Sequence, residues 1–66
     1  MTTTEWAAQF KKRSDEEILA IAESRDEASL ECLRRGRELN NKVWISDAGW
    51  HKNCAAALRQ LVSRRH

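Results

Sequence analysis

The chain has 66 residues, a formal net charge of +2 from 12 lysines and arginines against 10 aspartates and glutamates, and 41% hydrophobic residues. Its length excludes a two-domain protein and the large nucleotide-binding and barrel enzymes. No apolar run approaches the ~18 residues that a membrane-spanning helix needs, and no signal-peptide segment follows Met1, so we expect a cytoplasmic protein without a membrane partner.

Proline is absent and glycine occurs only twice, which leaves little turn chemistry for a β-sandwich and favours helices. Helix caps and apolar spacing predict an all-α fold in a single small domain over residues 1–66. We expect a compact bundle of three to four helices, at roughly residues 4–12, 14–24, 26–39 and 47–64.

The first 27 residues contain three helix-start patterns. A serine or threonine three residues before a glutamate is typical of a capping box, and this spacing occurs at Thr2–Glu5, Ser14–Glu17 and Ser24–Glu27. In the first helix, Trp6 and Phe10 then share one face. We interpret the third pattern as the end of the second helix and the start of the third.

The predicted third helix combines an apolar edge, formed by Leu30 and Leu33, with a stripe of small side chains at Ala28, Cys32 and Gly36. Such a stripe lets another helix approach closely, which would account for a glycine inside a helix despite its cost of ~1 kcal/mol. The alternative is that Gly36 ends the helix as its C′ residue.

A polar stretch at residues 40–42 and a short apolar stretch at residues 43–45 are predicted to form a loop before the last helix. Ser46 and Asp47 are the predicted cap of that helix. Apolar side chains at helical spacing then form its predicted core face: Trp50, Cys54, Ala57, Leu58 and Leu61.

Charge is segregated along the chain. Residues 14–33 carry seven acids and one base, whereas residues 34–66 carry eight bases and two acids. This asymmetry is typical of a protein that is steered electrostatically to a charged partner. The alternative is that the acidic and basic blocks neutralise each other within the fold.

Catalysis and metal binding have little support in the sequence. His51 and Cys54 lie three residues apart, but no orienting third group and no oxyanion site accompany them. The candidate metal ligands lack the tight pairs of structural zinc sites; they are Cys32, His51, Cys54 and His66. We therefore predict no enzyme activity, no metal site and no cofactor.

The favoured hypothesis is a non-catalytic module that binds a protein stoichiometrically, as an adaptor, regulator or inhibitor of a larger macromolecular machine. Accessory proteins of phages and plasmids are often modules of this kind. Tryptophan is enriched at the dominant positions of protein interfaces, and the predicted protein-binding site comprises Lys42, Val43, Trp44, Ile45 and His51. Homodimerisation is a further alternative. A domain of ~60 residues buries only ~60% of the surface that its unfolded chain exposes, and association of two copies is one way to stabilise so small a core.

The alternative function is direct binding of DNA or RNA through the basic C-terminal helix. Its candidate phosphate contacts are Lys52, Arg59, Arg64 and Arg65. The last two arginines also fit a solvated helix end whose charge complements the helix dipole.

Overall fold

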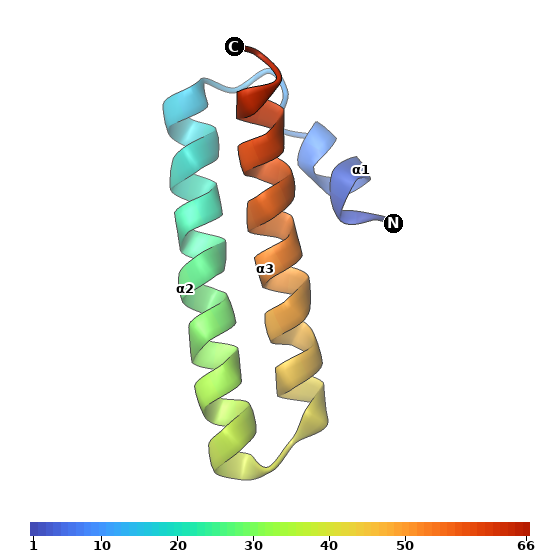
Figure 1. Cartoon of the computed structure of the whole chain (residues 1–66), viewed down its shortest axis with the longest axis vertical. Helices are drawn as coiled ribbons and strands as arrows, with labels where there is room; N and C mark the ends of the chain where they lie inside the picture. Colours follow the sequence, from blue (N-terminus) through green and yellow to red (C-terminus); the bar gives the residue numbers. More distant parts are fainter.

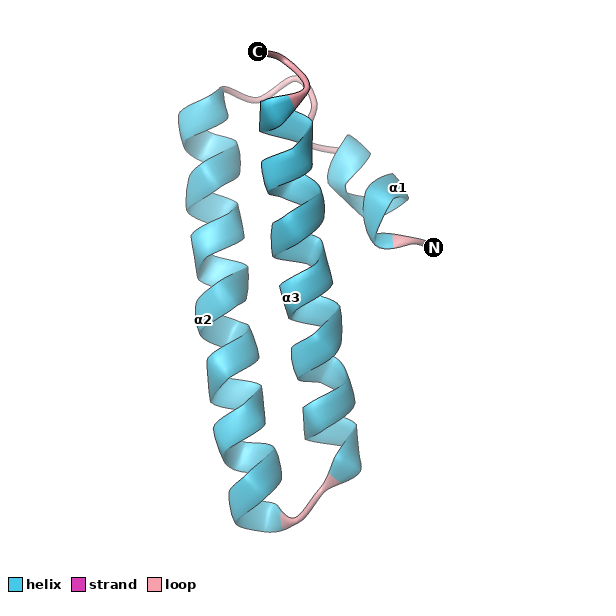
Figure 2. Cartoon of the chain, viewed as in Figure 1, coloured by secondary structure: helices cyan, strands magenta, loops and turns pink.

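The computed structural model describes residues 1–66 and contains three helices, α1 (Thr3–Ala8), α2 (Asp15–Leu39) and α3 (Lys42–Ser63). Figure 2 shows that loops join them and that no strand is present. α2 and α3 form a long antiparallel hairpin, and α1 packs against α3 at the end far from the α2–α3 loop (Figure 1). The all-α prediction is confirmed, and the number of helices is three.

α1 is shorter than the predicted helix over residues 4–12. Its start is as predicted: the Thr2 hydroxyl accepts a hydrogen bond from the Glu5 backbone N–H and donates one to the Glu5 carboxylate, each at 3.2 Å. The helix ends at Ala8, and the chain continues in turns in which the Phe10 N–H donates to the Ala7 carbonyl at 3.0 Å. The Trp6 and Phe10 rings meet edge to face, with centroids 5.1 Å apart.

α2 replaces the two helices predicted at residues 14–24 and 26–39, so the predicted break between them is wrong. Ser14 caps the helix as expected, because its hydroxyl accepts from the Glu17 N–H at 3.2 Å. Ser24 and Glu27 have the same spacing but lie inside the helix and are exposed. Backbone N–H groups in a helix interior already donate to the carbonyl four residues earlier, so no free donor remains there for a serine to cap.

α3 begins five residues before the predicted start at residue 47, and the predicted loop at residues 43–45 is wrong. Asn41 is the N-cap, and its side-chain oxygen accepts a hydrogen bond from the Val43 N–H at 2.9 Å. Asn40 closes α2 in the left-handed conformation, with φ of 50°. Two consecutive asparagines therefore end one helix and start the next.

The main core lies at the end of the hairpin that α1 covers. Its fully buried centre comprises Ala7, Ile18, Ala22, Ala55 and Leu58. Further hydrophobic side chains pack against this centre and are only partly buried: Trp6, Phe10, Ile21, Ala57, Leu61 and Val62. The core is therefore built from all three helices, but only over part of the length of the hairpin.

Towards the loop, α2 and α3 meet through small side chains. Ser29, Cys32 and Gly36 are the buried residues of α2 in this half, whereas Ala28 of the predicted stripe is only partly buried. A Cβ atom on Gly36 would lie 2.7 Å from Ile45 Cγ1, closer than two such atoms can approach. Gly36 is therefore an interior helix residue that permits close contact with α3, and the alternative that it is the C′ residue is wrong.

Candidate functional site

Exposed large hydrophobic side chains are concentrated in the loop half of the hairpin. Seven such residues are exposed in the chain, and five of them lie between residues 30 and 50: Leu30, Leu39, Val43, Ile45 and Trp50. α1 packs near the opposite end (Figure 1). The loop half is therefore a two-helix hairpin with no third helix over its apolar side chains.

These five residues lie on two opposite sides of the hairpin. Val43 and Trp50 are seven residues apart and share one side of α3, whereas Ile45 faces about 200° away from Val43. On α2, Leu30 and Leu39 are nine residues apart and face about 180° from each other. The exposed side chains therefore divide between the two broad sides.

A shallow hollow shows which side chains belong together. It is lined by Asp26, Ser29, Leu30, Leu33 and Lys52, and Ile45 lies seven residues before Lys52 on the same side of α3. We name this side, with Leu30, Leu33 and Ile45, the Leu30 face. The opposite side, with Leu39, Val43 and Trp50, is the Val43 face.

Trp50 was expected in the core and is instead 39% exposed, so that prediction is wrong. The hollows between α1 and α3 are lined on the α3 side by residues from Asn53 onwards, including Ala57 and Leu61. α1 thus stops short of Trp50. Cys54 and Leu58 of the predicted core face are fully buried, as expected.

The residues predicted to bind a protein do not form one surface. Val43 is 67% exposed on the Val43 face, and Ile45 is 44% exposed on the Leu30 face. Lys42 is exposed at the first position of α3. The remaining two side chains, Trp44 and His51, are half-buried.

Both of these half-buried side chains have an arginine of α2 as a neighbour. The guanidinium of Arg35 lies 5.9 Å from the centre of the Trp44 ring, a cation–π arrangement. Arg25 Nη1 donates a hydrogen bond to His51 Nδ1 at 3.0 Å. Trp44 and His51 are thus engaged with α2 and are less available to a partner than Val43 is.

The sequence pattern gives Leu39 no binding role and favours a core position for Trp50, although both flank Val43 on its face. The seven-residue spacing of Val43 and Trp50 was visible in the sequence. Such spacing has a structural meaning only within a helix, and the sequence predicts a loop at residues 43–45.

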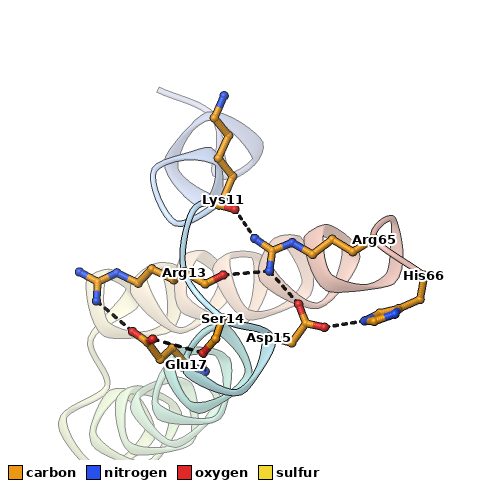
Figure 3. A network of polar contacts seen from close by, with 7 residues as sticks. All are labelled: Lys11, Arg13, Ser14, Asp15, Glu17, Arg65 and His66. Atoms are coloured by element: carbon orange, nitrogen blue, oxygen red, sulfur yellow. Dashed lines mark hydrogen bonds and ion pairs between the residues drawn. The ribbon is translucent and has the colours of Figure 1, made fainter.

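Two of the four bases predicted to contact nucleic acid make ion pairs within the chain. Arg59 Nη2 donates to Asp26 Oδ2 at 2.5 Å. Arg65 Nη1 donates to Asp15 Oδ1 at 2.7 Å and to the Arg13 carbonyl at 2.9 Å, and its other nitrogen donates to the carbonyl of Lys11 (Figure 3).

These contacts lower the pKa of both paired carboxylates. The hydrogen bond from Arg59 lowers the pKa of Asp26, and the nearby charge of Lys52 adds to the effect. Hydrogen bonds from His66 and Arg65 lower the pKa of Asp15. Acidic residues of the N-terminal half therefore neutralise bases of the C-terminal half, which is the self-neutralising alternative raised by the charge pattern.

Of the two remaining bases of that set, Arg64 is exposed at the C-cap of α3 and makes no ion pair. Lys52 is also exposed and makes no direct ion pair, but it lies beside Asp26. The predicted nucleic-acid surface thus has two unpaired bases, at separate places along α3.

The cysteines are free and buried, and burial raises the pKa of the Cys54 thiol. No group of three or more His, Cys, Asp or Glu side chains is placed to hold a metal ion. None of the three helices has both the length and the apolarity that crossing a membrane requires.

Comparison of the chain with protein-family models, curated proteins and solved structures gives no match.

Proposed function

We propose that the protein is a non-catalytic binding module that docks another protein on the Val43 face, and that it acts as an adaptor, regulator or inhibitor of a larger assembly. The observation that carries this proposal is the exposure of three large apolar side chains on one uncovered side: Leu39 at 62%, Val43 at 67% and Trp50 at 39%.

Burial of these side chains by a partner would supply free energy of binding. Full burial of a large apolar side chain contributes about 1.5–3 kcal/mol, and a partly exposed tryptophan beside aliphatic residues is typical of an interface centre. Trp50 is also held on a regular helix, so little side-chain and backbone freedom is lost on binding.

Direct nucleic-acid binding has weaker support. Each phosphate contact needs a base whose charge is available, and Arg59 and Arg65 already bond carboxylates of α2. The two unpaired bases, Lys52 and Arg64, are twelve residues apart and do not form one basic patch.

The proposal is tested by affinity capture from the source cells with three immobilised chains: wild type, Val43→Glu and Leu19→Glu. Leu19 is the matched control because it is also exposed, at 43%, but lies at the opposite end of the hairpin. We expect one protein to be enriched by wild type and Leu19→Glu and lost with Val43→Glu. A set of captured proteins that is identical for all three chains would contradict the proposal.

Binding of nucleic acid is measured in parallel with duplex DNA and duplex RNA over a salt series. We expect no binding at low salt. Binding that falls steeply with salt and is abolished by Lys52→Ala and Arg64→Ala would favour the alternative function instead.

A further inference from the structure

The Leu30 face carries a regular seam that no part of the chain covers. Along α2, the residues on this side follow one another at alternating spacings of four and three: Leu19, Glu23, Asp26, Leu30, Leu33 and Arg37. This spacing places the six side chains on one side of α2, and three of them, Leu19, Leu30 and Leu33, are apolar. Leu30 is 68% exposed in the middle of the seam, beside a hollow of about 340 Å³ that is open to solvent.

Two charged residues of this seam are exposed and make no ion pair or side-chain hydrogen bond within the chain. They are Glu23 and Arg37. Each lies seven residues from Leu30, one before it and one after it. Asp26, which lies between Glu23 and Leu30, is already paired with Arg59. Arg59 is also close enough to Glu23 for the Glu23 charge to raise its pKa, but the two side chains make no direct ion pair.

The symmetric positions of Glu23 and Arg37 about Leu30 indicate a second copy of the chain as the partner of this face. A two-fold axis at Leu30 sets α2 antiparallel to α2 of a second copy and places Glu23 opposite Arg37 of that copy, at two symmetric positions. A parallel arrangement would instead place Glu23 against Glu23 and Arg37 against Arg37, and like charges that face each other are destabilising. The charges of Glu23 and Arg37 are thus complementary in the antiparallel direction and repulsive in the parallel one, and Lys52 of each copy, beside Asp26, lies at the edge of the contact.

We propose that two copies of the chain associate through their Leu30 faces, with α2 antiparallel to α2 of the second copy. Leu30, Leu33 and Ile45 of both copies form the apolar centre, and the two Glu23–Arg37 pairs lie at its ends. Contacts of this kind, in which both copies use the same surface, are typical of two-fold dimers.

The molecule is 41 Å long and 22 Å wide, so α2 can pack along its length against α2 of a second copy. The Val43 face lies on the opposite side of the hairpin and stays uncovered in this dimer. The inference therefore does not rest on the proposed function.

Sedimentation equilibrium over a wide range of protein concentration tests the inference. We expect the wild type to be a dimer in equilibrium with monomer. Leu30→Glu is expected to be monomeric. It should also stay folded, with an unchanged circular dichroism spectrum, because Leu30 is mostly exposed in the single chain. Leu39→Glu is the matched control, since Leu39 has a similar exposure of 62% on the other face, and it should remain a dimer.

Charge reversal tests the antiparallel register separately. Glu23→Arg and Arg37→Glu, each alone, should raise the dissociation constant roughly tenfold, because each change affects two symmetric pairs. The double variant Glu23→Arg with Arg37→Glu should restore the wild-type value.

Three results would overturn the inference. They are a wild-type chain that stays monomeric at every concentration, a dimer that Leu30→Glu leaves intact, and single charge reversals that the double reversal does not rescue. A protein partner captured by wild type and lost with Leu30→Glu, while the wild type is monomeric, would likewise show that a different molecule occupies this face. Val43→Glu should leave the dimer unchanged, which separates this test from that of the proposed function.

Discussion

Gly36 and Gly49 provide a matched pair of substitutions, because both lie inside long helices in very different surroundings. A Cβ atom on Gly36 would lie 2.7 Å from Ile45 Cγ1 and 3.2 Å from Trp44 Cβ. A Cβ atom on Gly49 would meet nothing within 4 Å. The same change to alanine should therefore alter the free energy of unfolding in opposite directions at the two positions.

The magnitude follows from two opposing effects. Alanine in place of glycine stabilises a helix interior by about 0.5–1 kcal/mol at either position. At Gly36, the added methyl also overlaps Ile45 and the Cβ of Trp44, and overpacking of this kind costs about 1–3 kcal/mol. We expect Gly49→Ala to be stabilising by about 0.5–1 kcal/mol and Gly36→Ala to be destabilising by up to about 2 kcal/mol.

The assay is urea denaturation followed by circular dichroism, with both glycine substitutions made in the Leu30→Glu chain so that association does not contribute. In thermal unfolding, 1 kcal/mol corresponds to about 4–8 °C for a domain of this size. If Gly36→Ala stabilises the chain as much as Gly49→Ala does, α2 and α3 are not in close contact near the loop, and the reasoning is refuted.

Three further predictions concern the polar contacts and the thiol. Asp15→Asn should flatten the pH dependence of stability: because Arg65 and His66 lower the pKa of Asp15, its contribution is present above the ordinary carboxyl pKa and is lost as the pH falls through the lowered value. Urea midpoints measured across acidic pH check this, and parallel curves for the two proteins would contradict it. Ser29→Ala should cost about 1 kcal/mol in the same assay, because the buried Ser29 hydroxyl donates to the Ala48 carbonyl at 2.8 Å; an unchanged midpoint would show that the bond contributes nothing. Cys54 should not react with a thiol reagent in the folded chain and should react on unfolding, because it is buried and its pKa is raised; rapid labelling of the native chain would disprove this.

The helix class and two helix starts could be predicted because they depend on residues close together in the sequence. The hydroxyls of Thr2 and Ser14 make the capping bonds that their spacing to a glutamate indicates. Ser24 has the same local sequence pattern without the cap. The spacing alone does not reveal whether the backbone N–H groups are free, and this depends on whether the helix continues before the serine.

The candidate binding faces were harder to predict, because exposure depends on where the helices end relative to one another. Trp50 has helical spacing with Cys54 and Leu58 and would be buried under a longer α1. The N-terminal end of α1 lies nearest Trp50, and the hollow at Thr3 and Thr4 reaches along α3 only as far as Asn53, so Trp50 lies beyond the cover of α1. Leu30 was likewise expected to form an apolar helix edge, and its exposure follows from the absence of a third helix over the loop half of the hairpin.

The start of α3 also changed the predicted site. With Asn41 as its cap, the apolar stretch at residues 43–45 is helical, and its side chains point to opposite sides. Val43 and Ile45, expected to act together in one loop, therefore belong to different faces. The division of this segment between two surfaces depends on the start of α3, which the sequence pattern placed at residue 47.

The most direct test of the proposed function is photo-cross-linking in the source cells, with a photoreactive phenylalanine analogue at Val43 in one variant and at Leu19 in another. We expect a cross-linked product with a protein other than a second copy of the chain from the Val43 position, and no such product from the Leu19 position. Equal products from both positions, or none from Val43, would contradict the claim that the Val43 face binds a protein partner.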